Sequence, residues 1–237
     1  MSPSNTQVKA ITISFMLIYA AVFVTSLKGY QPVKLISLLN FITSFSLLAV
    51  ISLLAFNPIS ELPIGAEMPK ADVKMKDISG KEISLKDVKN TNGLLVMFSC
   101  NTCPYVIKNQ QRTNEICKFA LENKIGVVLV NSNEAQRDGD DSYEAMKSYA
   151  QAQGFKWYYT IDKNSELADA FGANRTPENF LFNKTGKLVY HGAIDDNPSD
   201  PGSVNRKHLQ EAISEMLNGK DVSVKTSRSV GCSIKRV

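Results

Sequence analysis

Residues 93–104 read Gly-Leu-Leu-Val-Met-Phe-Ser-Cys-Asn-Thr-Cys-Pro, and this stretch decides the fold. Its first part, residues 93–99, is a short continuous apolar run, which is typical of a strand buried in the centre of a sheet. Residues 104–123 follow with a helical pattern, and the proline that begins them is tolerated in the first turn of a helix. Cys100 and Cys103 therefore lie where a buried strand passes into a helix.

This position has a chemical consequence for both thiols. Unpaired amide N–H groups and the helix dipole favour negative charge at a helix N-terminus, so we expect the pKa of Cys100 to fall and its thiolate to form near neutral pH. Cys103 follows three residues later, about one helical turn, which brings its sulfur beside the first. The pair is therefore expected to exchange disulfides, with Cys100 attacking and Cys103 resolving the mixed disulfide.

A metal site is the main alternative for a Cys-x-x-Cys pair, because such a pair can be half of a zinc site. The other half would be a second pair at ligand spacing, whereas the remaining cysteines and histidines stand singly. They are Cys117, Cys232, His191 and His208. Cys117 falls among apolar residues of the helical stretch and is expected to be a small core residue. We therefore expect no metal and no other cofactor.

From residue 69 onward, the chain alternates between strand and helix patterns. The expected strands cover residues 73–77, 82–85, 93–99, 124–131, 156–161, 179–183 and 187–191, and the expected helices cover 104–123, 142–153, 165–171 and 204–218, with Asn164 as the cap of the third. Glycine-containing turns at 79–80 and 184–186 indicate two hairpins. The alternation predicts an α/β three-layer sandwich with a largely parallel centre and antiparallel strands at one side.

A resemblance to a known family rests on four short motifs. These are Cys-Asn-Thr-Cys-Pro-Tyr at 100–105, Arg-Thr-Pro-Glu at 175–178, Tyr-His-Gly at 190–192 and Gly-Cys-Ser-Ile-Lys at 231–235. Together they resemble the thioredoxin superfamily, and more narrowly its redoxin branch, the alkyl hydroperoxide reductase/thiol-specific antioxidant-like group. The resemblance runs from about residue 69 to the C-terminus.

The resemblance implies a thioredoxin-like fold and a thiol-disulfide oxidoreductase that uses the Cys-x-x-Cys pair. It implies that Pro177 is a cis proline facing that pair, and that the exposed backbone of Thr176 pairs with an incoming peptide or thiol substrate. Electrons would then pass by exchange with a protein thiol or disulfide partner.

Two departures from the family keep other functions open. Thioredoxin has Trp before its first cysteine where this chain has Ser99, and peroxiredoxins have Thr and Pro where this chain has Met97 and Gly93. A thiol peroxidase without the usual pocket is one alternative. The other is a copper-binding assembly factor that uses the cysteine pair together with His191, a ligand set known in this fold with three residues between the cysteines rather than two.

The C-terminal tail offers a third thiol. Residues 219–232 could span at most ~46 Å when fully extended, which is enough to reach the cysteine pair of a domain of this size. Gly231 and Cys232 are followed by Ile234, an apolar residue in a largely polar tail. A tail cysteine without a redox role is the simpler interpretation. The sharper hypothesis is a third exchanging thiol, with Cys100 as its disulfide partner when Cys103 is replaced by serine.

Two uncharged apolar runs precede the domain, at residues 11–27 and 35–56. A membrane-spanning helix needs roughly 17–25 apolar residues, so we expect a membrane segment of two helices at 1–56, a Pro- and Gly-containing linker at 57–68, and the thioredoxin-like domain at 69–237. A cleavable signal peptide is the alternative for the second run. That run is longer than the roughly 7–15 residues usual for a signal, and no clear cleavage site follows it.

Charge sets the expected orientation and excludes one class of partner. The loop between the two runs carries Lys28 and Lys34, and lysine-rich loops stay in the cytoplasm, so the domain is expected to face the periplasm or cell exterior. The net charge of +4 arises largely from three lysines before residue 61, which leaves 24 basic against 23 acidic residues in the remainder. A domain so nearly neutral gives no sign of nucleic-acid binding.

The orientation can be tested with a reporter that is active only outside the cytoplasm, fused after Val237. We expect it to be active, because the positively charged loop holds the domain on the opposite side of the membrane. Activity only from a cytoplasmic reporter at the same position would place the domain inside.

Overall fold

The computed structural model describes residues 61–237. The expected membrane segment at 1–56 and the first residues of the expected linker lie outside the described residues. Within 61–237, no helix is both long and apolar enough to cross a bilayer.

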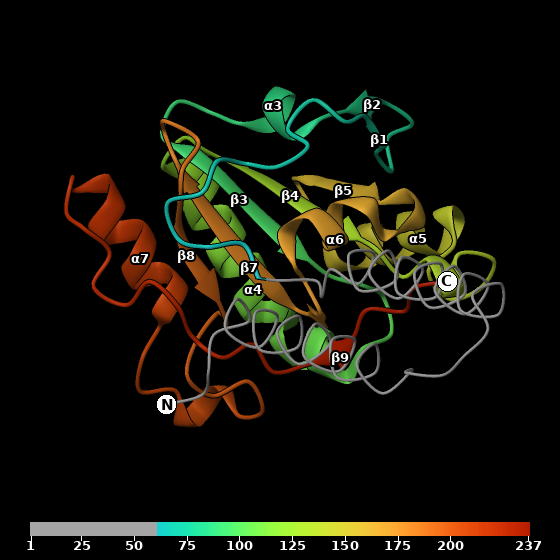
Figure 1. Ribbon diagram of the computed structural model, residues 1–237. Helices are drawn as coiled ribbons and strands as arrows, with labels where there is room; N and C mark the ends of the chain where they lie inside the picture. The colour runs from blue at the N-terminus through green and yellow to red at the C-terminus, as the bar shows by residue number, and fades with distance from the viewer. Residues whose placement is uncertain (1–60) are drawn as a thin grey trace, which may run out of the picture. The chain divides into compact units, whose positions relative to one another are not determined.

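Five strands make up the central mixed sheet, in the order β5-β4-β3-β7-β8 (Figure 1). They are β3 (Gly93–Phe98), β4 (Ile125–Asn131), β5 (Tyr158–Ile161), β7 (Glu178–Asn183) and β8 (Leu188–Gly192). β4 pairs parallel with β5, and β7 pairs antiparallel with both β3 and β8. β3 and β4 run in the same direction, because Asn92 N–H donates to Lys124 O at their beginnings and Ser99 N–H donates to Val130 O at their ends.

Alternate residues of each strand face two separate cores, as the period of a strand requires. In β3, Leu94 and Val96 face one core, while Leu95 and Met97 face the other, and all four are fully buried. The first core is covered by α3 (Leu85–Val88) and α6 (Glu166–Phe171), and the second by α4 (Pro104–Glu122), α5 (Tyr143–Gln153) and α7 (His208–Leu217). Two helix layers therefore enclose the sheet, which is the α/β sandwich that the sequence predicts.

The remaining elements are short. They are the strands β1 (Met75–Lys76), β2 (Glu82–Ile83), β6 (Arg175–Thr176) and β9 (Cys232–Ser233), and the 3₁₀ turns η1 (Glu134–Gln136), η2 (Lys163–Ser165) and η3 (Pro201–Ser203). β1 and β2 form the first predicted hairpin, and β7 and β8 form the second. β6 pairs antiparallel with β9, so the tail returns to the body of the domain.

Two helix starts differ from the sequence prediction. Asn164 does not cap α6, because it adopts a left-handed conformation inside the turn η2. The Asp162 carboxylate instead accepts hydrogen bonds from the free N–H groups of Leu167 and Ala168, at 2.8 and 2.9 Å. The last helix begins at His208 rather than at 204, because residues 201–203 form the separate turn η3.

The second half of the expected linker lies against the domain. The N–H groups of Leu62, Gly65 and Met68 donate to backbone oxygens of Phe171, Leu188 and Gly186, at 2.8–3.2 Å. Leu62, Ile64 and Met68 also pack against the core that α3 and α6 cover. Leu62, Ile64 and Met68 therefore attach residues 62–68 to the domain.

The capping role of Asp162 predicts the effect of its removal. Asp162→Ala leaves two buried N–H groups of α6 without an acceptor, so we expect a loss of about 1–2 kcal/mol in the free energy of unfolding. The urea midpoint, followed through the fluorescence of Trp157, measures it. Asp72→Ala is the matched control, because that carboxylate makes only an exposed ion pair with Lys86 and should change stability little. Equal midpoints for the two variants would contradict the capping role.

Candidate active site

The two cysteines of the motif lie where the sequence places them, at the end of β3 and the start of α4. Cys103 is the N-cap residue of α4, and Pro104 is the first residue of that helix. Cys100 lies in the short connection between β3 and the cap. Both side chains are buried, with exposed fractions of 2% and 3%. The structure therefore presents two adjacent thiols beneath a cover rather than an open surface pair.

Thr176 supplies part of that cover and contacts both sulfurs. Its peptide bond to Pro177 is cis, as the family resemblance implies. The Thr176 hydroxyl oxygen lies 3.3 Å from Cys100 Sγ, and the Cys103 thiol donates to the Thr176 carbonyl oxygen at 3.2 Å. One residue thus positions the two thiols that are far from it in the sequence.

The tail supplies the rest of the cover. Cys232 pairs with Thr176 in the β6–β9 ladder, and its sulfur lies 2.7 Å from Cys103 Sγ. Its backbone N–H also donates to Cys103 Sγ at 3.4 Å. Gly231 fits because it has no side chain, since a Cβ there would lie 2.0 Å from the Thr176 carbonyl oxygen. The tail therefore brings a third sulfur to the cysteine pair, against Cys103 rather than Cys100.

The pKa values of the two thiols shift in opposite directions. The hydrogen bond from the Cys100 thiol lowers the pKa of Cys103 to about 4, and hydrogen bonds from the Cys232 thiol and from the Val106 and Cys232 N–H groups contribute. The same hydrogen bond to Cys103, together with burial, raises the pKa of Cys100. The lowered pKa that the sequence predicts for Cys100 therefore falls on Cys103, chiefly because Cys103 accepts the hydrogen bond between the two sulfurs.

The other two thiols have raised pKa values. Burial and the hydrogen bond to Cys103 raise the pKa of Cys232 to about 11. Burial also raises the pKa of Cys117, which is fully buried in the core between the sheet and α4. Cys117 is therefore the core residue that the sequence predicts, and it serves as a natural control thiol.

Residues 63–207 match the Redoxin family, and this stretch is more than half of the chain. The chain belongs to the Redoxin family. This redoxin is 29% identical over 129 residues to the thiol-disulfide oxidoreductase ResA of Bacillus thuringiensis (strain Al Hakam), a match that covers 54% of this chain and 69% of ResA. The enzyme class expected from the sequence is thus the class of this relative.

Two solved structures share the fold of the redoxin. An uncharacterised conserved protein from Geobacillus kaustophilus is 32% identical, with a TM-score of 0.69 and coverage of 74% of this chain and 93% of its own. A hypothetical protein from Sinorhizobium meliloti 1021 is 30% identical, also with a TM-score of 0.69, and covers 75% of this chain and 97% of its own. The predicted thioredoxin-like α/β fold with a mixed central sheet, and the redoxin branch of the superfamily, are confirmed.

A buried polar network in the redoxin holds the loop of the motif, and the sequence analysis does not find it. The Asp141 carboxylate accepts from Asn101 N–H at 2.9 Å and from Asn131 Nδ2 at 2.7 Å. The Tyr159 hydroxyl donates to Asn101 Oδ1 at 2.9 Å. Asp141 is fully buried, and its charge also contributes to the raised pKa of Cys100. The only sequence signal was Asn131 at the carboxyl end of a buried strand, where functional polar residues often lie.

His191 belongs to a different cluster of the redoxin. Its Nε2 lies 2.8 Å from the buried Glu178 carboxylate, and its ring stacks on Phe180 with ring centroids 4.3 Å apart. Among residues 61–237, no three histidine, cysteine or acidic side chains form a group that could hold a metal ion. His191 therefore contacts Glu178 and Phe180. Within residues 61–237 it does not form a three-ligand group with Cys100 and Cys103, as the copper alternative would require.

The peroxidase alternative also gains no support from the redoxin structure. The threonine of the peroxiredoxin pattern would stand at Met97, whose side chain is fully buried in the core with α4. The side chain at this position thus points into the core between the sheet and the helix.

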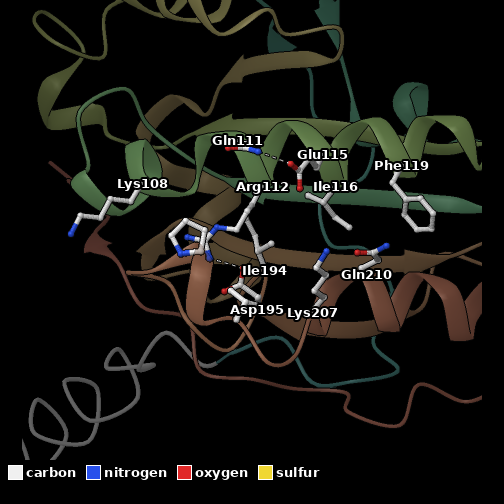
Figure 2. A pocket seen from close by; sticks show the side chains of 12 residues that line it. Lys108, Gln111, Arg112, Glu115, Ile116, Phe119, Ile194, Asp195, Lys207 and Gln210 are labelled. Atoms are coloured by element: carbon white, nitrogen blue, oxygen red, sulfur yellow. Dashed lines mark hydrogen bonds and ion pairs between the residues drawn. The ribbon is translucent and has the colours of Figure 1, made fainter.

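A separate polar pocket of about 390 Å³ lies between α4 and α7, and none of the cysteines lines it (Figure 2). Arg112 points across it to Asp195, with 2.6 Å between Nη1 and Oδ2. The same guanidinium donates to the Asn197 backbone oxygen at 2.7 Å. Arg112 is thus occupied in holding the 195–198 loop, which gives it a structural role in the redoxin.

The charge distribution of the pair predicts a titration. The ultraviolet absorbance of thiolate in the reduced protein should show one group with a pKa of about 4. Cys103→Ala should remove this transition, and Cys100→Ala should move it to higher pH, because the thiol that donates to the Cys103 thiolate is lost. Cys117→Ala should leave it unchanged. A low-pH transition that survives in Cys103→Ala and disappears in Cys100→Ala would assign the charge to Cys100.

Proposed function

We propose that this redoxin is a membrane-anchored thiol-disulfide oxidoreductase that exchanges disulfides with a protein partner through Cys100 and Cys103. The observation that carries the proposal is the buried pair of cysteines held against Thr176, whose hydroxyl oxygen lies 3.3 Å from Cys100 Sγ and whose carbonyl oxygen lies 3.2 Å from Cys103 Sγ. Membership of the Redoxin family and the ResA relatives support the same chemistry.

The first step uses the shared proton. With Cys103 as thiolate and Cys100 as thiol, Cys103 accepts the Cys100 proton as Cys100 Sγ attacks the disulfide R–S–S–R′ of the partner. A Cys100–S–S–R bond forms, the partner disulfide breaks, and R′S⁻ leaves. The Thr176 carbonyl oxygen, 3.2 Å from Cys103 Sγ, accepts the S–H hydrogen bond of the protonated Cys103. Cys103 thus acts as the general base of the attack.

The second step closes the internal disulfide. The leaving thiolate takes the Cys103 proton and departs as R′SH. The Cys103 thiolate then attacks Cys100 Sγ, which forms the Cys100–Cys103 disulfide and releases RS⁻. Two electrons pass from the two thiols to the partner, and the reverse sequence returns them. The reaction therefore needs no cofactor.

The substrate surface of the proposal is the edge formed by Thr176 and Pro177. Thr176 presents its backbone to an antiparallel neighbour, as its pairing with Cys232 illustrates. An extended partner segment would bind by the same main-chain hydrogen bonds, with its sulfur directed toward the cysteine pair.

The location of the protein follows from the N-terminal sequence. We propose that residues 11–56 hold the protein in the membrane and that the domain faces the periplasm or cell exterior, where disulfides persist. Contact with the membrane is thus assigned to the N-terminal segment. The near-neutral charge of the remainder supports a protein partner rather than a nucleic acid.

A trapping experiment with glutathione disulfide tests the exchange. In Cys103→Ser, the thiol that resolves the mixed disulfide is absent, so we expect a glutathione adduct on Cys100 to accumulate. The rate at which the protein turns over glutathione disulfide should fall by ~100-fold or more. Cys117→Ala should turn over as the unmodified protein does. Peptide mass mapping locates the adduct. Undiminished turnover of Cys103→Ser would contradict the two-cysteine reaction.

A further inference from the structure

We propose that Cys232 is a third exchanging thiol that takes the disulfide from Cys100–Cys103 by attacking Cys103, and so carries it onto the C-terminal tail. The inference rests on the proposed function, because that reaction supplies the Cys100–Cys103 disulfide. The Redoxin match ends at residue 207, so the tail lies beyond it.

The C-terminal tail is hydrogen-bonded to the rest of the domain on both sides of Cys232. On the N-terminal side, His191 N–H donates to Lys225 O and Ser227 N–H donates to His191 O, each at 3.0 Å. The Ser227 hydroxyl also lies 2.6 Å from the Tyr190 hydroxyl. These contacts join the tail to β8 before it reaches the cysteine pair.

The contacts beyond Cys232 are equally specific. Ile234 is 6% exposed and packs into the core that α3 and α6 cover. Its N–H donates to Asn174 O at 3.1 Å, and Lys235 N–H donates to Asn133 Oδ1 at 2.9 Å. Arg236 Nε pairs with Asp169 at 2.8 Å. The buried side chain of Ile234 thus anchors the tail two residues beyond Cys232.

The segment that contains Cys232 occupies the edge at which a partner segment would bind, with its sulfur beside Cys103 rather than Cys100. Cys232 forms the antiparallel pair with Thr176, the residue that presents the substrate edge, and its sulfur is 2.7 Å from Cys103 Sγ. The tail is therefore an internal strand on the substrate edge, and a partner segment must displace it to bind there. Attack on Cys103 needs little further movement of the Cys232 sulfur.

The exchange step is balanced and needs no external oxidant. The Cys232 thiol loses its proton to solvent, and its sulfur attacks Cys103 Sγ in the Cys100–Cys103 disulfide. A Cys103–Cys232 bond forms, the Cys100–Cys103 bond breaks, and Cys100 leaves as a thiolate that takes up a proton. One disulfide is consumed and one is formed. Cys100 thereby returns to the thiol form, and the disulfide is held between Cys103 and the tail.

The decisive experiment maps disulfides in the full-length protein after exposure to glutathione disulfide. The cysteines are alkylated at low pH and the linkages are identified by peptide mass mapping. In Cys100→Ser, Cys103 attacks glutathione disulfide, and we expect Cys232 to resolve the adduct into an internal Cys103–Cys232 disulfide. Cys117→Ala is the control for the loss of a cysteine that takes no part. In the unmodified protein, we expect both Cys100–Cys103 and Cys103–Cys232 linkages.

A second variant tests the docking of the tail. Ile234→Ala removes the buried anchor without touching a sulfur, so the Cys103–Cys232 linkage should decrease roughly tenfold relative to Cys100–Cys103. If Cys100→Ser fails to fold, as judged by its circular dichroism, the role of Cys232 is tested by whether the unmodified protein forms the Cys103–Cys232 disulfide.

The outcomes separate this inference from the proposed function. A Cys100→Ser protein that keeps a glutathione adduct on Cys103 with Cys232 as a free thiol overturns the role of Cys232, and so does an unmodified protein with only Cys100–Cys103. Failure of the unmodified protein to form any internal disulfide that contains Cys103 would instead refute the proposed function. A Cys103→Ser protein that forms Cys100–Cys232 would contradict the placement of Cys232 against Cys103.

Discussion

The arrangement of the site depends on Thr176, which contacts every participant. Its hydroxyl faces Cys100, its carbonyl oxygen accepts from Cys103, and its backbone pairs with Cys232. These three sulfurs come from distant parts of the chain, since Cys103 and Cys232 are 129 residues apart. Because Thr176 is 1% exposed and lies next to β7, the rigid sheet fixes its position. The geometry of the cysteine pair is therefore set by the fold and not by the short loop that contains it.

The chemistry of the pair follows from the unequal pKa values of two neighbouring thiols in a buried site. A thiolate at Cys103 is stabilised by the donors around it, while the raised pKa of Cys100 keeps its proton until a partner arrives. The pair titrates as a unit, so reactivity at Cys100 depends on the charge of Cys103 and on what Cys103 contacts. The tail contacts Cys103 and occupies the substrate edge, which connects access for a partner with the redox state of the third thiol.

Much of this could be predicted from the sequence, because its local signals agree with the fold. The apolar run before Cys100 and the proline after Cys103 defined the strand–helix junction, and the family motif placed Pro177. Two features that the sequence does not show depend on long-range contacts, namely the buried carboxylate of Asp141 and the contact of Cys232 with Cys103. The cap at Asp162 is local, and Asn164 was predicted in its place because the sequence does not show the left-handed turn at 163–165. The start of the helix at Pro104 was predicted correctly, but the lowered pKa of Cys103 was not, because the hydrogen bonds around the sulfurs form only in the folded chain.

The most direct test of the account is a redox titration of the full-length protein in glutathione buffers, with each cysteine followed by mass mapping. The account predicts that an internal disulfide containing Cys103 forms and disappears reversibly in a two-electron transition, while Cys117 stays a thiol throughout. Stable glutathione adducts on single cysteines, without any internal disulfide at any ratio of oxidised to reduced glutathione, would contradict it.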